Sequence, residues 1–260
     1  MLKTLLSITG IYKLYEKWLG HQIKSDKGPD HIGVILDGNR RWAEEHSLPI
    51  WLGHRQGADK IECLLDWCFD LDVKSITLYA FSTENFLRPL QEVEEIMKIA
   101  EEKLTQILTD ERIYKNKVRV KIIGRRRLLP KPLQELSKKV EDATKDYDEH
   151  FLNVALAYGG RAEIVDAARK LAQEVEKGRL KPDAIEEDTF EKHLYTAHLP
   201  KQEPDMIIRT SGEERLSGFL LWQSAYSELF FLDIYWPDFR RIDLLRAIRT
   251  FQRRGRRFGR

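Results

Sequence analysis

An apolar run that ends in a polar turn, HIGVILDGNRRW at residues 31–42, decides the fold of this chain. Residues 32–36 are all apolar or glycine, a pattern typical of a strand buried on both faces of a parallel sheet. The next five residues are Asp37, Gly38, Asn39, Arg40 and Arg41. The stretch therefore predicts a buried strand whose carboxyl end carries a turn rich in polar groups.

Five further apolar runs predict the rest of the sheet. They lie at residues 75–80, 118–123, 152–157, 206–208 and 229–232. Apolar residues at helical spacing separate them, at 61–71, 93–108, 133–148 and 162–177. Strands that alternate with helices predict an α/β protein, a single domain with a six-stranded, largely parallel sheet flanked by helices. The length of 260 residues and the 42% hydrophobic content fit one large domain.

Positive charge is concentrated in the C-terminal segment. Nine arginines and one acid lie in residues 240–260, whereas residues 1–239 carry a net charge of −6. This segment predicts either a contact with nucleic acid, anionic lipid or a phosphorylated substrate, or an amphipathic helix with a solvated face. Ile242, Leu245, Ile248 and Phe251 repeat at helical spacing, as the second interpretation requires. Because the sequence has no RRM, KH or zinc-finger pattern, we expect no nucleic acid partner.

The N-terminal segment, residues 1–28, predicts an amphipathic helix and a linker that precede the body of the chain at 29–260. Apolar side chains of residues 2–19 share one helical stripe, so this helix lies either on a membrane surface or on the exterior of its own domain. Residues 20–30 are the predicted linker. No apolar run reaches the ~18 residues of a membrane-spanning helix. Two cysteines, Cys63 and Cys68, fit no disulfide or CxxC motif, so we expect a cytoplasmic protein.

Polar residues follow five of the predicted strands directly. They are residues 37–41, 81–85, 124–127, 158–161 and 209–213. Ligands of open parallel sheets bind at the carboxyl ends of the strands, so we expect all five groups to meet there. Glycines, helix N-termini and arginine forks suit phosphate oxygens, and the sequence therefore predicts a site for more than one phosphate.

Two interpretations of Asp37 are open. Its carboxylate suits Mg²⁺ that is shared with a diphosphate, whereas Asp-Gly-Asn is also a strong turn signal. The adjacent pair Arg40 and Arg41 favours the functional interpretation. The chain has no GxxxxGK[ST], no GxGxxG after a strand and no GxSxG, which argues against common nucleotide-binding and hydrolase sites.

Several motifs resemble those of the cis-prenyltransferases, the family of undecaprenyl and dehydrodolichyl diphosphate synthases. They are residues 31–42, Gly53-His54 with Gly57, residues 78–86 with Arg88-Pro89, residues 158–161, and residues 208–223 with Glu228 and Trp236-Pro237. The resemblance implies a Mg²⁺-dependent prenyltransferase. This enzyme would extend farnesyl or geranylgeranyl diphosphate by sequential cis-condensation of isopentenyl diphosphate, giving a long-chain polyprenyl diphosphate for a glycosyl carrier lipid.

The resemblance also implies roles for individual residues. Asp37, Asn85 and Ser82 would be catalytic, and Asp37 and Glu228 would hold the metal, Glu228 across a dimer interface. The substrate-binding residues would be Gly38, Asn39, Arg40, Arg41, Trp42, His54, Thr83, Glu84, Phe86, Arg88, Gly160, Arg161, Arg209, Arg215, Leu216, Ser217, Arg257 and Gly259. Since an amide is a weak base, water, the diphosphate or Asp37 are alternative acceptors for the proton that Asn85 would take.

A growing hydrocarbon product needs an elongated hydrophobic tunnel, because each buried CH₂ group gains about 0.8 kcal/mol by leaving water. Two apolar stripes are candidate walls: Ile61, Leu64, Leu65 and Cys68, and Val93, Ile96, Met97, Ala100 and Leu104. Ordinary core packing is the alternative for each residue. The resemblance further implies a homodimer, and the first helix offers a peripheral contact with the membrane that receives the product.

Departures from the family pattern concern the choice of starter. Arg40 stands where many bacterial relatives carry glycine, and Ile50, Phe86 and Glu214 also differ from frequent residues. The alternative function is a non-catalytic partner subunit of a heteromeric cis-prenyltransferase. Such partners lose the Asp and Asn motifs, whereas Asp37, Asn85 and Arg209 are all present here, so the sequence favours an enzyme.

Overall fold

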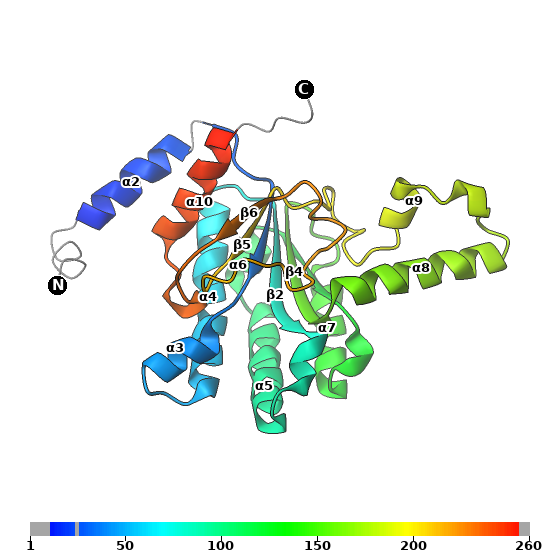
Figure 1. Cartoon of the computed structure of the whole chain (residues 1–260), viewed down its shortest axis with the longest axis horizontal. Coiled ribbons are helices and arrows are strands. Elements are labelled where there is room, and N and C mark those ends of the chain that lie inside the picture. The colour runs from blue at the N-terminus through cyan, green and yellow to red at the C-terminus, as the bar shows by residue number, and fades with distance from the viewer. Residues whose placement is uncertain (1–10, 24–25, 255–260) are drawn as a thin grey trace.

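The computed structural model describes residues 11–23 and 26–254, in which six strands form one sheet (Figure 1). The strands are β1 (His31–Ile35), β2 (Ser75–Ser82), β3 (Val118–Ile123), β4 (His150–Tyr158), β5 (Met206–Arg209) and β6 (Glu228–Phe231). Their order is β3-β4-β2-β1-β5-β6, and every neighbouring pair is parallel. The predicted fold class is confirmed, and each predicted strand lies within two residues of an observed one.

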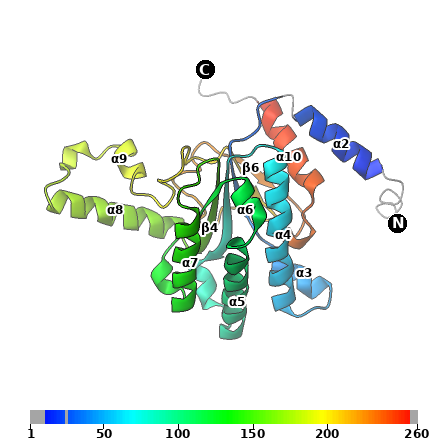
Figure 2. The ribbon, with the colours of Figure 1, turned by 180° about the vertical axis from the view of Figure 1, so that it is seen from behind.

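Helices flank this sheet. They are α2 (Ile11–Ile23), α3 (Asn39–Glu45), α4 (Ile50–Asp70), α5 (Leu90–Ile107), α6 (Glu111–Lys115), α7 (Lys131–Thr144), α8 (Gly160–Glu176), α9 (Glu187–Glu191) and α10 (Arg241–Arg254). Short 3₁₀ turns are η1 (Thr83–Leu87), η2 (Arg126–Leu128), η3 (Pro182–Ala184) and η4 (Trp236–Asp238). Seen from behind, α4, α5 and α7 lie in front of the sheet, while α8 and α9 project to one side (Figure 2).

Alternate residues of the central strands enter two separate cores. Ile32 and Val34 of β1 join the larger cluster, together with side chains of α4, α5, α7 and α10. Ile35 joins a smaller cluster on the other face, where Phe219 and Leu220 cover the sheet. Because both faces are covered, most residues of the central strands are apolar, which explains the apolar runs of the sequence.

The first described helix packs against the last one, and Figure 1 shows α2 and α10 side by side. Leu19 and Ile23 are buried, and the guanidinium of Arg249 lies 5.0 Å from the ring centre of Trp18. The C-terminal half of α2 therefore rests on its own domain. The helix extends to Ile23, into the segment predicted to be a linker. Residues 1–10 lie outside the described residues. No helix of the described part is long and apolar enough to cross a membrane.

Candidate active site

A pocket of about 1040 Å³ lies at the carboxyl edge of the sheet. Residues that follow β1, β2, β4 and β5 line it, since these strands are neighbours in the sheet. The lining includes five arginines, Arg40, Arg41, Arg88, Arg161 and Arg209, against three carboxylates, Asp37, Glu44 and Glu84. The excess of guanidinium groups suits a ligand with several negative charges, as the sequence predicts.

Asp37 and Arg209 form the central ion pair of the pocket. The strand register places Ile35 of β1 opposite Arg209 of β5. Asp37 follows two residues after Ile35, so its carboxylate lies beside the end of β5. There, Arg209 Nη2 donates to Asp37 Oδ2 at 2.7 Å. Burial raises the pKa of Asp37, but the hydrogen bonds and charge of Arg209 outweigh it and hold that pKa below its usual range. Arg209 Nη1 also donates to Ser217 Oγ at 2.8 Å and to the Arg215 carbonyl. Asp37 is therefore an ionised carboxylate that faces the pocket.

The turn after β1 depends on two glycines. Gly38 has φ 105°, and a Cβ there would lie 2.7 Å from the ring of Tyr235. A Cβ on Gly53 of α4 would lie 2.1 Å from the Asn39 carbonyl oxygen. These contacts let α3 start at the pocket and pack against α4, with the first amides of α3 beside Asp37. Arg41, on the same helix, lies 3.5 Å from Asp37 and 3.4 Å from Glu213.

A second cluster of charges surrounds Glu92, which the sequence does not single out. Its Oε1 atom lies 3.0 Å from His54 Nε2, 3.2 Å from Arg88 Nη1 and 3.7 Å from Arg40 Nε. Burial lowers the pKa of His54, although the hydrogen bond to Glu92 raises it in part. Glu92 thus holds three predicted diphosphate-binding residues together. Its spacing of four residues from Arg88 is the one sequence signal for this role.

Asn85 caps the turn that follows β2. Its Oδ1 accepts a hydrogen bond from the Ser82 N–H at 3.0 Å, within a capping box at the start of η1. The amide oxygen is therefore engaged, and the NH₂ group is left as a hydrogen-bond donor. This geometry favours a donor role for Asn85 and a different group as the proton acceptor.

The fourth part of the pocket is the start of α8. Gly159, Gly160 and Arg161 line the pocket, and the Gly160 N–H donates to the Gly218 carbonyl at 2.8 Å. The N-terminus of a helix favours anions, so this end of α8 adds to the positive field of the arginines.

Some predicted residues lie away from the pocket. Arginines 125–127 do not line it, because β3 is the outermost strand; Arg125 pairs with Asp166 at 3.0 Å and Arg126 pairs with Glu141. The prediction that five strand ends meet is therefore wrong for β3. Glu228 begins β6 opposite Met206, at the amino edge, so Glu228 and Asp37 of one chain cannot hold the same ion.

Four further residues of the predicted substrate site are also outside the pocket lining. Trp42 donates to Asp238 at 3.0 Å, and Phe86 packs on Phe81. The Arg215 side chain is 62% exposed and pairs with Glu213, while Leu216 packs on the smaller core cluster. Arg257 and Gly259 lie outside the described residues. The other predicted site residues, namely Gly38, Asn39, Arg40, Arg41, His54, Ser82, Thr83, Glu84, Asn85, Arg88, Gly160, Arg161, Arg209 and Ser217, line the pocket with Asp37.

An apolar cavity of about 360 Å³ adjoins the pocket between α4, α5 and the sheet. Leu36, Asn39, His54, Ala80 and Ile96 line both spaces. From the two predicted stripes, Ile61, Leu65, Ile96, Ala100 and Leu104 face the cavity, while Leu64, Cys68, Val93 and Met97 are buried elsewhere in the core. The pocket for charged groups thus continues into a space suited to hydrocarbon.

Comparisons with known proteins agree with this geometry. The family model "Putative undecaprenyl diphosphate synthase" matches residues 35–259. The tritrans,polycis-undecaprenyl-diphosphate synthase (geranylgeranyl-diphosphate specific) of Methanopyrus kandleri is 55% identical, over 98% of this chain and 93% of that one. The protein of the same name from Methanocaldococcus jannaschii is 52% identical, over 98% of this chain and 91% of its own.

Solved structures give the same result. Lavandulyl diphosphate synthase from Lavandula x intermedia, in complex with dimethylallyl diphosphate, superposes with a TM-score of 0.86 at 36% identity, over 90% of this chain and 99% of that one. A probable undecaprenyl diphosphate synthase from Campylobacter jejuni superposes with a TM-score of 0.72 at 32% identity, over 90% of this chain and 100% of that one.

The fold and the pocket define an α/β protein with a pocket rich in arginine beside an apolar cavity, the arrangement expected of a prenyltransferase. The chain belongs to the undecaprenyl diphosphate synthase family, the cis-prenyltransferases, and its reaction builds a cis-polyprenyl diphosphate.

Proposed function

We propose that this enzyme extends geranylgeranyl diphosphate with isopentenyl diphosphate and releases a long polyprenyl diphosphate for a glycosyl carrier lipid. The observation that carries the proposal is the apolar cavity that opens from the Asp37–Arg209 pocket. The names of the archaeal relatives, which specify geranylgeranyl diphosphate, support this starter over farnesyl diphosphate.

The pocket offers separate places for the two substrates. Arg40, Arg41, Arg88 and His54 would bind the allylic diphosphate near the first amides of α3, with its hydrocarbon tail in the cavity. Arg209 and Ser217, which are 2.8 Å apart, would bind the isopentenyl diphosphate. As the allylic C–O bond breaks, negative charge develops on the leaving diphosphate, and fixed guanidinium and amide donors stabilise it.

A magnesium ion fits the donors of this site. Asp37 is ionised, its side chain is 28% exposed, and no cluster of three metal-ligating side chains occurs among residues 11–23 and 26–254. Mg²⁺ commonly takes one or two carboxylates together with substrate phosphate oxygens, which matches a lone aspartate in a diphosphate pocket. Bound there, the ion would neutralise charge on the leaving diphosphate. Asp37, in contact with Arg209, would orient the ion and the diphosphate.

We also propose a homodimer in which Glu228, Arg257 and Gly259 serve the neighbouring active site. Glu228 lies at the amino edge of its own sheet and pairs with Arg254 at 3.4 Å, which leaves a second chain as its route to the metal. Mixing inactive Asp37→Ala and Glu228→Gln proteins should restore part of the activity. A mixture that stays inactive although the two proteins have exchanged subunits would remove Glu228 from the neighbouring active site.

The start of the chain is proposed to touch the cytoplasmic face of the membrane that receives the product. Leu14 and Trp18 of α2 are exposed, and Arg249 of α10 lies over the ring of Trp18. Flotation with anionic vesicles should carry the full chain and lose the Leu14→Ser/Trp18→Ser variant. Equal flotation of both proteins would remove α2 from membrane contact.

Product analysis with each starter tests the proposed function. Purified protein, Mg²⁺ and labelled isopentenyl diphosphate are mixed with geranylgeranyl or farnesyl diphosphate, and extractable products are sized by reversed-phase chromatography. We expect a ladder that ends in a long chain, with the higher kcat/KM for geranylgeranyl diphosphate. Preference for farnesyl diphosphate would overturn the starter, and no incorporation with either one would favour a partner subunit.

A further inference from the structure

One end of the apolar cavity is lined by charged side chains. The shared residues His54 and Ile96 mark the end that meets the pocket. Glu62 lies eight residues beyond His54 on α4, which is about 12 Å of helix, and Lys103 lies seven residues beyond Ile96 on α5. Asp110 and Arg112, at the start of α6, also line the cavity. The charged residues are therefore at the end remote from the diphosphate pocket.

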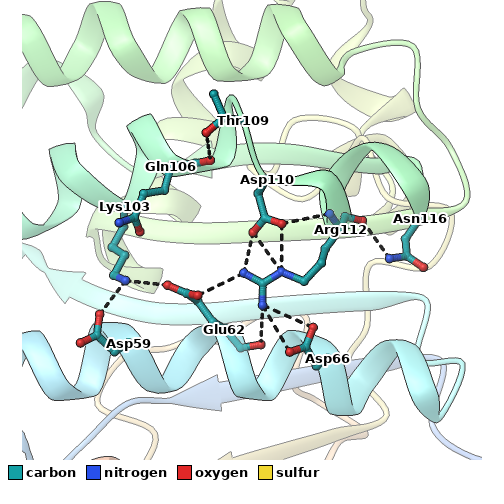
Figure 3. Close-up of polar contacts among 9 residues, drawn as sticks. All are labelled: Asp59, Glu62, Asp66, Lys103, Gln106, Thr109, Asp110, Arg112 and Asn116. Carbon is teal, nitrogen blue, oxygen red and sulfur yellow. Dashed lines mark hydrogen bonds and ion pairs between the residues drawn. The ribbon is translucent and has the colours of Figure 1, made fainter.

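Ion pairs join the three helices at this remote end (Figure 3). Lys103 Nζ of α5 lies 2.6 Å from Asp59 Oδ1 and 2.7 Å from Glu62 Oε1, both on α4. Arg112 Nη2 lies 3.1 Å from Glu62 Oε2 and 2.6 Å from Asp110, and Arg112 Nη1 is 3.3 Å from Asp66. Glu62 is thus the carboxylate that links both cations, as the dashed lines of Figure 3 show.

The network lies at the boundary between the cavity and solvent. Lys103 is 21% exposed and Arg112 is 31% exposed, whereas the carboxylates of Asp59 and Asp66 are about half exposed. Hydrogen bonds from Lys103 lower the pKa of Glu62, so the pair is ionised at neutral pH. Ion pairs of this exposure are individually weak, and the closure they form opens at low cost.

The size of the cavity requires an opening. A space of about 360 Å³ is near the lower limit of the roughly 300–1,000 Å³ range typical of small-ligand sites. A polyprenyl chain of many five-carbon units exceeds that space. Its leading end must therefore pass the remote end of the cavity or stop there.

We propose that the ion pairs of Lys103 and Arg112 with the carboxylates of α4 are a gate at the remote end of the product cavity, and that their strength sets product length. This inference rests on the proposed function, because it requires that the tail grow into this cavity. While the gate is closed, the growing tail meets charged groups that hydrocarbon cannot solvate. When the ion pairs separate, the tail leaves between α4 and α5 and elongation continues.

Two variants weaken the gate, and a third is a matched control. Lys103→Met removes the ion pairs of Lys103 with Asp59 and Glu62 of α4 while keeping an unbranched side chain. Glu62→Gln weakens the ion pairs of this residue with Lys103 and Arg112. The control, Glu102→Gln, weakens another α4–α5 ion pair, Arg55–Glu102 at 2.7 Å, neither residue of which lines the cavity. Ala100→Phe fills the middle of the cavity and reports whether the tail occupies it.

Product lengths are compared for wild type and these four variants, with labelled isopentenyl diphosphate and geranylgeranyl diphosphate. We expect Lys103→Met and Glu62→Gln to shift the main product to chains longer by one or more five-carbon units, Glu102→Gln to match wild type, and Ala100→Phe to shorten the product. Circular dichroism checks folding, and if Lys103→Met does not fold, Glu62→Gln carries the test alone.

The other outcomes separate the two proposals. If Ala100→Phe shortens the product while neither gate variant lengthens it, the gate is overturned and the proposed function stands. A longer product in Glu102→Gln as well would overturn the gate in favour of general loosening between α4 and α5. If wild type forms no polyprenyl product, the proposed function fails and the gate fails with it.

Discussion

The two edges of the sheet differ in what their polar side chains face. At the amino edge, His31, Thr77, Asn153 and His198 bond to one another in a chain with distances of 2.8, 3.0 and 2.8 Å. At the carboxyl edge, polar groups face a pocket, and Asn39 Oδ1 is buried without a partner among the described residues. Polar groups that bond to one another inside the protein stabilise the fold, whereas groups that line a pocket can also reach a ligand.

The largest expected effect is at the carboxyl edge. Asp37→Ala should lower kcat/KM for isopentenyl diphosphate incorporation about 1,000-fold, which is about 4 kcal/mol, because the metal loses the carboxylate that this pocket supplies. Steady-state kinetics measure this change, with circular dichroism to confirm the fold. Asp142→Ala, an exposed aspartate of α7, is the control and should keep full activity. A rate near that of wild type in Asp37→Ala would remove this residue from the reaction.

At the amino edge, the buried His31 should instead change how the stability of the protein depends on pH. Burial lowers the pKa of His31 to about 4, whereas the unfolded chain has a value of 6.5. The unfolded state therefore takes up the proton first, and stability is full above pH 6.5 and falls as the pH drops toward 4. At about 1.4 kcal/mol per pKa unit, the loss is on the order of 3 kcal/mol.

Urea unfolding of wild type and His31→Gln between pH 4 and 7 measures this loss. The variant should show a flatter dependence, while the exposed His21→Gln should follow wild type. Equal slopes for wild type and His31→Gln would assign the acid sensitivity to other groups.

The smallest expected effects come from substitutions at the two ends of β2. Thr77→Val should cost about 2 kcal/mol of unfolding free energy, because it leaves the Asn153 amide without its acceptor, and should leave kcat and KM unchanged. Ser82→Ala, at the pocket end of the strand, should reduce kcat/KM about tenfold with a smaller loss of stability. Chemical unfolding and kinetics on both variants check the contrast, and an activity loss in Thr77→Val would remove the distinction between the edges.

Much of the fold is predictable from the sequence, because strands buried on both faces form runs that are mostly apolar. The run at 118–123 coincides with β3, and the others differ from the strands by one or two residues. Strand order is not encoded in any local pattern, and this is why the arginines after β3 were expected at the pocket. These arginines follow β3, which is an outermost strand in the order β3-β4-β2-β1-β5-β6.

The site was predictable where motifs follow neighbouring strands. Asp37, Asn85 and Arg209 are of this kind, and all three line one pocket. Glu92 was missed because its partners come from α3, α4 and the end of η1, so its role emerges only when these elements pack together. The gate at Glu62 and Lys103 depends in the same way on packing between α4 and α5.

The Asp37–Arg209 pair has a consequence for biosynthesis, because its two residues are 172 positions apart in the chain. Strand β1 leaves the ribosome early, yet its neighbour β5 follows only after β2, β3 and β4. Such distant pairing slows folding, since a large loop must close before the contact forms. A nascent chain therefore has no complete diphosphate pocket, and isoprenoid diphosphates meet a finished site only after nearly all of the protein has been synthesised.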